Sequence, residues 1–144
     1  MMKKTYIMIL FLSIVVIIGA LCKIFLFHTV PLFENPDDMT VHVVRVKSDN
    51  IQRLEEHVMN ESQKTKVLEY LSKCKMQRTL DIDNGKWSVE EVDIYMYLSD
   101  DIQHQSYIVR LGKTNIIFNT NNSIIYKICD GDTVNADMKE IIYS

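Results

Sequence analysis

The stretch VDIYMYLS, residues 92–99, decides what kind of fold this chain can adopt. Aliphatic side chains alternate in it with polar and aromatic ones: Val92, Ile94, Met96 and Leu98 against Asp93, Tyr95, Tyr97 and Ser99. Successive side chains of a β-strand point to opposite faces, so this pattern predicts a strand with one aliphatic face. Such a face has to be covered, which indicates a sheet packed against a second layer.

Three more strands are predicted after this one. Residues 106–111 and 115–118 flank a Gly112-Lys113 turn, and residues 124–128 follow an Asn-rich turn. Short turns between consecutive strands favour antiparallel neighbours. We therefore expect an antiparallel meander.

The clearest helix outside the N-terminal region is predicted over residues 61–75. Asn60 followed by Gln63 resembles a capping box. Helical spacing puts four apolar residues on one face: Val67, Leu68, Leu71 and Cys74. We expect this face to meet the aliphatic face of the sheet.

The predicted fold class is α+β, one main helix packed on a four- to five-stranded antiparallel sheet in two layers. This domain covers residues 39–144 and follows a stalk at residues 28–38, which holds both prolines and several acidic residues. Residues 39–46 suit a first strand and residues 136–143 a short closing helix. Residues 51–59 fit either a helix or a hairpin partner, and the sequence leaves this open.

The N-terminal segment predicts a transmembrane anchor over residues 1–27. Residues 6–27 carry only one charge, Lys23, near their C-terminal end. A helix of this length, rising about 1.5 Å per residue, spans about 33 Å, which exceeds the hydrocarbon core of about 30 Å. The expected first partner is therefore the lipid bilayer, through residues 6–27.

The charges beside this segment predict its orientation. Lys3 and Lys4 precede it, and acidic residues follow it. Basic flanks stay in the cytoplasm, so we expect a single-pass plasma-membrane protein with a cytoplasmic N-terminus and an extracytoplasmic domain. Two alternatives stay open: a signal peptide cleaved near residues 19–22, and a lipoprotein acylated at Cys22.

Composition excludes several classes of protein. The chain has 144 residues, of which 47% are apolar and 24% charged, so it is neither disordered nor multidomain. All 19 acidic residues follow residue 27, which leaves the domain acidic and argues against nucleic acid as a partner. One local basic stretch could meet an anionic wall polymer or a lipid surface: Lys64, Lys66, Lys73, Lys75 and Arg78. Glu61 and Glu69 interrupt it, and we interpret it as a solvated helix face.

Cys74 and Cys129 are the two cysteines of the predicted outer domain. Disulfides form in oxidising compartments, so this pair is a candidate bridge. Two separate cysteines, each a small buried hydrophobic residue, fit the spacing about as well.

No stretch of the sequence indicates catalysis, a cofactor or a metal. The segment Asp130-Gly131-Asp132 does not place ligands or glycine as a calcium loop requires, and the four histidines lack zinc-ligand spacing. Glu55-Glu56-His57 is the nearest approach to a ligand cluster, but adjacent side chains diverge. We therefore expect a protein that is not an enzyme.

An aromatic patch is the strongest candidate for binding. Tyr95 and Tyr97 should point away from the aliphatic face, with Trp87 and Tyr107 near them. Aromatic side chains with a polar tip are favoured at interfaces. We expect a protein, peptide or cell-wall partner there, although cross-strand packing alone also explains tyrosines on a sheet.

Three quoted segments carry a resemblance: SQKTKVLEYLSKCK, WSVEEVDIYMYLSDD and LGKTNIIFNTNNSIIYKI. Their order behind an anchor resembles small single-pass membrane-anchored proteins of unknown function from Gram-positive bacteria. The resemblance implies an extracytoplasmic helix-on-sheet domain at the bacterial cell surface, and it implies no catalytic residues.

Two functions follow as hypotheses. In the first, the protein is a non-enzymatic binding or accessory module that recognises its partner through a sheet face or sheet edge. In the second, it is a structural or inhibitor-like subunit of a membrane complex, and the transmembrane helix itself makes the contact. The sequence does not specify an oligomeric state.

Overall fold

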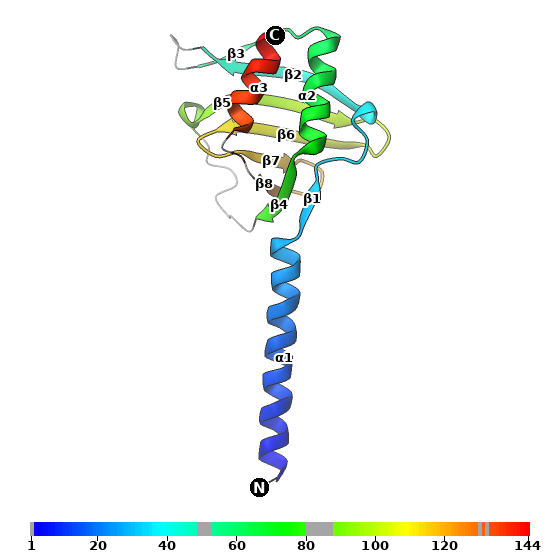
Figure 1. Ribbon diagram of the computed structural model, residues 1–144, viewed down its shortest axis with the longest axis vertical. Coiled ribbons are helices and arrows are strands. Elements are labelled where there is room, and N and C mark those ends of the chain that lie inside the picture. Colours follow the sequence, from blue (N-terminus) through cyan, green and yellow to red (C-terminus); the bar gives the residue numbers. More distant parts are fainter. Residues whose placement is uncertain (1, 49–52, 80–87, 130, 132) are drawn as a thin grey trace.

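A computed structural model describes residues 2–48, 53–79, 88–129, 131 and 133–144 of the chain. It shows an α+β protein in which a long N-terminal helix leads into an antiparallel sheet domain (Figure 1). The predicted class is confirmed, and the sheet has eight strands instead of four or five.

Helix α1 (Met2–Phe27) is the apolar N-terminal segment. Its stretch Lys4–Phe25 is long and apolar enough to cross a membrane, and none of it is buried in the protein. Large apolar side chains on every side of the helix are exposed, from 45% at Ile14 to 69% at Tyr6. A helix apolar on all sides and outside any protein core is typical of a membrane span or a signal sequence.

The eight strands form one sheet in the order β1-β4-β8-β7-β6-β5-β2-β3, and every neighbouring pair is antiparallel. Their bounds are β1 (Thr29–Pro31), β2 (Met39–Lys47), β3 (Leu54–Glu56), β4 (Lys75–Thr79), β5 (Val92–Asp100), β6 (Gln105–Gly112), β7 (Ile116–Asn119) and β8 (Ile124–Ile128). Two short 3₁₀ helices, η1 (Pro36–Asp38) and η2 (Val89–Glu91), precede β2 and β5.

The predicted meander is confirmed, because β5, β6, β7 and β8 are consecutive neighbours in the sheet. The additional strands are the short ones, β1, β3 and β4, whose three to five residues are too few to show alternation. Strand β3 resolves the open reading of residues 51–59, of which the structure describes 53–59, in favour of a hairpin partner for β2.

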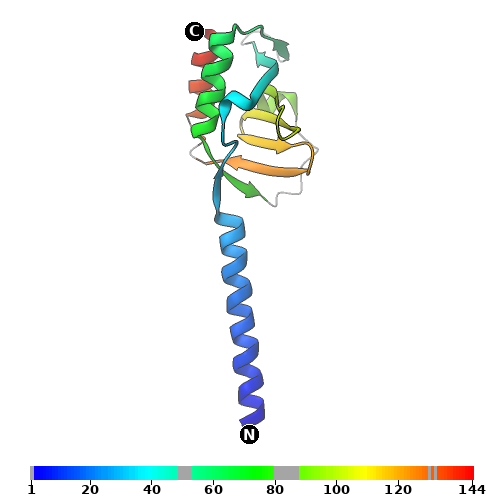
Figure 2. The same ribbon diagram turned by 90° about the vertical axis from the view of Figure 1, so that its right-hand side faces the viewer.

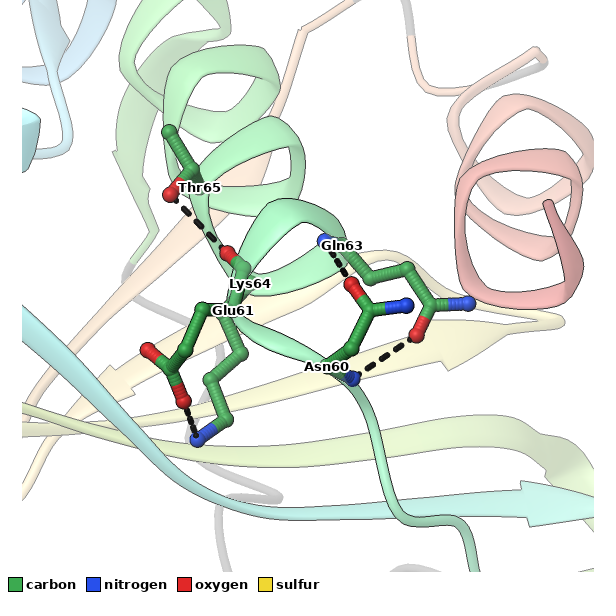
Figure 3. A network of polar contacts seen from close by, with 5 residues as sticks. All are labelled: Asn60, Glu61, Gln63, Lys64 and Thr65. Carbon is green, nitrogen blue, oxygen red and sulfur yellow. Dashed lines mark hydrogen bonds and ion pairs between the residues drawn. The ribbon is translucent and has the colours of Figure 1, made fainter.

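Helix α2 (Glu61–Lys73) begins at the predicted capping box (Figure 3). The Gln63 backbone N–H donates to Asn60 Oδ1, and the Asn60 backbone N–H donates to Gln63 Oε1, both at 2.9 Å. These bonds satisfy two backbone donors that the first turn leaves without helical partners. The helix ends two residues before the predicted bound, because Cys74 is extended (φ −69°, ψ 136°) and Lys75 already belongs to β4.

Both domain helices lie on one side of the sheet (Figure 2). Helix α3 (Val134–Tyr143) packs beside α2, so the helical layer consists of these two helices. The core joins Val67, Leu68 and Leu71 of α2 to the aliphatic face of β5, as predicted. Met138 and Ile142 of α3 complete it, and both are fully buried.

The segment expected to be a stalk, residues 28–38, is part of the domain. Strand β1 pairs with β4, and Leu32 and Phe33 are only 6% and 7% exposed within the core. The two buried side chains hold the segment against the domain despite its prolines and acidic residues. The sheet therefore begins directly after α1.

Replacing Leu71 with Ala should lower the free energy of unfolding by about 3 kcal/mol, because it leaves a cavity where α2 meets the sheet. Urea unfolding of the detergent-solubilised chain measures this change. The control is Val58→Ala, whose side chain is 87% exposed and should change stability little. Equal losses in the two variants would contradict the assignment of the core.

Candidate functional site

An open groove lies at the end of the sheet farthest from α1. Strand β4 contacts α1, and the strand order places β3 at the opposite edge (Figure 1). The groove has a volume of about 570 Å³ and runs between this edge and α3. Its lining comes from β2 and the residue after it, from β3 and the residue after it, and from α3: Val46, Lys47, Ser48, Glu55, Glu56, His57, Lys139, Glu140 and Tyr143.

The α3 end of the groove is aromatic. The rings of His57 and Tyr143 meet edge to face, with centroids 5.2 Å apart and an interplanar angle of 70°. Tyr143 is nevertheless 61% exposed, so most of its ring faces solvent. An exposed ring with a polar tip offers contact area to a partner at low entropic cost.

Both lysines of the groove are already engaged. Lys139 Nζ lies 3.5 Å from Asp93 Oδ2, which also accepts a 2.7 Å hydrogen bond from Asn135. Lys47 Nζ donates to the backbone carbonyl of Glu90 at 2.6 Å. The positive charge in the lining is therefore held toward the protein.

Two carboxylates of the groove face outward without a counter-ion. Arg53 pairs with Glu55 at 3.1 Å, whereas no residue that the structure describes forms an ion pair with Glu56 or Glu140. Both side chains are exposed. The groove consequently offers uncompensated negative charge, which favours a cationic partner.

Strand β3 borders the groove with a free backbone edge. It pairs with β2 on one side, from Arg45 opposite Glu56 to Lys47 opposite Leu54, and β2 is its only neighbour among the described strands. The His57 N–H continues this ladder to the Val44 carbonyl at 2.9 Å. The outer N–H and C=O groups of an edge strand can pair with a further extended chain.

A partly buried hydrogen bond joins α3, which forms one wall of the groove, to α2. The Tyr70 hydroxyl on α2 donates to Asp137 Oδ2 on α3 at 2.6 Å. Burial and this bond to Asp137 together raise the pKa of Tyr70 to about 12. Burial also raises the pKa of the neighbouring Cys74 thiol, with a smaller effect from Asp137. Near the other end of α3, Gln63 donates to the Ile142 carbonyl at 2.8 Å.

The predicted aromatic patch is divided between the two faces of the sheet. Tyr95 and Tyr97 lie on the outer face, opposite the helices, and are half-buried. Tyr97 contacts the ring of His42 at 5.4 Å between centroids and donates to Ser106 at 3.1 Å. Tyr107 is on the helix-covered face, only 7% exposed and part of the core. Trp87 lies outside the described residues.

A chain of polar contacts runs along the same outer face. His42 Nε2 is 2.6 Å from Ser99 Oγ, and the Ser99 hydroxyl donates to Asp101 Oδ1 at 3.1 Å. The hydroxyl proton of Ser99 is used in the bond to Asp101. Ser99 Oγ therefore accepts the hydrogen bond from His42 Nε2. The carboxylate thus binds the serine instead of orienting the imidazole, which is the reverse of the arrangement that activates a serine nucleophile.

Cys74 and Cys129 are free thiols, and no bridge joins them. Cys74 packs against the core at the end of α2. Cys129 follows β8, where its N–H donates to the Lys75 carbonyl at 2.8 Å.

Among the described residues no group of three or more His, Cys, Asp or Glu side chains is placed to hold a metal ion. Two residues of the Asp130-Gly131-Asp132 segment, the aspartates, lie outside that part of the chain. Comparison with protein-family models, with curated proteins and with solved structures finds no match for this chain.

The sequence does not predict the groove, because its lining comes from two segments far apart in the chain, 46–57 and 139–143. The one local signal is Glu55-Glu56-His57, the nearest approach to a ligand cluster in the sequence. All three line the groove, although they do not converge on one point as metal ligands would.

The Tyr70–Asp137 bond predicts a loss of stability at high pH. The pKa of Tyr70 in the folded chain, about 12, lies above its ordinary value of 10.0, so the folded state favours the neutral phenol. This contribution is fully present below pH 10 and is lost as the pH rises toward 12. Tyr70→Phe should cost about 1 kcal/mol at neutral pH and should make the decline in this window shallower.

Urea unfolding at a series of pH values measures both effects. Tyr143→Phe serves as the matched control, because its exposed ring lies on α3 without this bond. If Tyr70→Phe and the control keep the same pH dependence as the unmodified chain, the proposed coupling is wrong.

Proposed function

We propose that this protein is a membrane-anchored, extracytoplasmic and non-enzymatic binding or accessory module. The observation that carries the proposal is the strand order. The sheet starts beside α1 and ends at β3, so the groove between β3 and α3 lies at the end farthest from the helix. A partner in the surrounding solution can reach this groove without approaching the bilayer.

The anchor rests on α1 and its flanking charges. The helix is apolar on every side and exposed along its length, which lipid tails would tolerate and water would not. Lys3 and Lys4 precede the apolar stretch, and this supports a cytoplasmic N-terminus. The sheet domain then lies outside the cell.

The chemistry of the groove supports one class of partner, an extended basic segment of a protein or peptide. Strand β3 offers main-chain hydrogen bonds to an added strand. Glu56 and Glu140 offer charge to lysine or arginine side chains, and Tyr143 offers a ring for stacking. Main-chain pairing supplies affinity, and the charges supply selectivity and speed of encounter.

A contact through α1 is the alternative, in which the protein is a structural or inhibitor-like subunit of a membrane complex. The exposed apolar surface of α1 is compatible with packing against another transmembrane helix. The two proposals assign the partner to opposite ends of the molecule, so one set of variants separates them.

External protease should test the anchor and its orientation. In intact cells that express the full chain, we expect digestion to leave a short, protected N-terminal fragment in the membrane fraction, detected by mass spectrometry. The protein in lysed cells serves as the control for cleavage. A soluble product that begins near residue 21 would show a secreted domain, and full protection from external protease would reverse the orientation.

Peptides of defined charge should test the groove. An alternating Lys-Thr peptide should bind the full chain in detergent, and the matching Glu-Thr peptide should not. The double variant Glu56→Gln/Glu140→Gln should weaken binding of the Lys-Thr peptide at least about fivefold, because two uncompensated charges are lost. Fluorescence anisotropy of labelled peptides measures the change.

Three matched changes control this measurement. Glu34→Gln removes an exposed carboxylate outside the groove and should leave binding intact. Tyr95→Ala/Tyr97→Ala should also leave it intact, and loss of binding there alone would move the site to the outer sheet face. In cells, loss of a captured partner when an unrelated transmembrane segment replaces residues 6–27 would favour the helix contact.

A further inference from the structure

We propose that the α1-proximal edge of the sheet docks onto anionic phospholipid headgroups, with Arg78 of β4 as the main contact. This inference rests on the proposed function in one respect, that α1 spans the bilayer. It assigns a second surface to the domain, at the opposite end from the groove.

The backbone allows almost no distance between the end of α1 and the sheet. Helix α1 ends at Phe27, its last turn is extended by a hydrogen bond from the His28 N–H to the Ile24 carbonyl at 3.0 Å, and β1 begins at Thr29. Strand β1 pairs at once with β4, from Thr29 opposite Gln77 to Pro31 opposite Lys75. Strand β4 is therefore held at the level where α1 would leave the membrane.

Arg78 marks this level directly. Its guanidinium carbon lies 4.7 Å above the centre of the Phe25 ring. Phe25 closes the stretch of α1 that is apolar enough to span a membrane. A cation stacked on a ring at this depth lies in the headgroup region, where the phosphates of the lipids are.

Stacking on Phe25 leaves the N–H donors of Arg78 available for hydrogen bonds, as far as the described residues are concerned. A guanidinium group stacks through its flat face, while its N–H donors lie in the plane and point outward. No described carboxylate forms an ion pair with Arg78. This fork of donors matches the oxygen atoms of a phosphate group.

Further cations lie at the same end of the sheet as Arg78, but Lys75 and Lys127 are on its other face, because Met76 and Ile128 beside them face the core. Lys75 belongs to β4, Lys127 stands opposite Gln77 on β8, and Lys73 closes α2; all three are exposed. None of the residues of β1, β4, β7 and β8 is acidic. Clustered lysine and arginine beside a membrane span are the usual means of attracting anionic lipids.

The structure divides the basic stretch of the sequence, residues 64–78, into two groups of cations at opposite ends of α2. Lys64 pairs with Glu61 at 2.6 Å in the first turn of α2, far from the membrane end. Lys73, Lys75 and Arg78 follow at the other end of that helix and on the strand after it. Only the second group is placed to meet headgroups.

Lipid selection by the full chain in nanodiscs tests the proposal. The chain is inserted into nanodiscs of phosphatidylcholine with a minor share of phosphatidylglycerol, and native mass spectrometry counts the lipids that stay bound after release. We expect phosphatidylglycerol to be enriched over its share of the bilayer. Arg78→Gln should reduce this enrichment by about fivefold, as expected for one cation at a membrane surface, and high salt should reduce it for the unmodified chain.

Two further variants make the result decisive. Lys66→Gln removes an exposed cation of α2 outside the proposed surface and should keep the enrichment. Phe25→Leu removes the ring that orients Arg78 while it preserves the apolar span, and should lower the enrichment even if Arg78→Gln fails to fold.

The outcomes distinguish this inference from the proposed anchor. Insertion into the nanodisc with no phosphatidylglycerol enrichment, or enrichment unchanged in both Arg78→Gln and Phe25→Leu, would overturn the headgroup contact alone. Failure of the chain to insert at all would overturn the anchor, and the headgroup contact with it.

Discussion

Burial of one aliphatic sheet face is the constraint on which the rest of the structure depends. Strand β5 presents Ile94, Met96 and Leu98 to one side, and each of them is fully buried. Two helices are needed to cover the eight-stranded sheet, and both lie on that side (Figure 2). Placing α3 beside α2 also brings its charged and aromatic residues to the edge strand β3, so the packing that stabilises the domain creates the groove.

Because β1 follows α1 directly, one edge of the sheet is held beside α1 and the other edge lies away from it. Strands succeed one another away from α1, from β4 with its cations to β3 with its carboxylates. The chain itself has a formal net charge of −3, which gives no hint of this separation. The separation of charge along the sheet is therefore a property of the folded chain and not of its composition.

The polar contacts of the domain are mainly structural. The bond between Tyr70 and Asp137 joins the helices, and the contacts of Lys139 and Asn135 with Asp93 join α3 to the sheet. The contacts between His42, Ser99 and Asp101 link neighbouring strands on the outer face, in an order unsuited to nucleophilic catalysis.

The sequence by itself determined what periodicity encodes: the apolar helix, the capped helix α2 and the meander β5 to β8, because each pattern extends over several residues. Tertiary structure decided the rest. The short strands β1, β3 and β4 exist because neighbours pair with them, Tyr107 faces inward because its register with Leu98 requires it, and Leu32 and Phe33 join the core because β1 brings them there. The groove and the contact of Arg78 with Phe25 join residues distant in sequence, and only the folded chain brings them together.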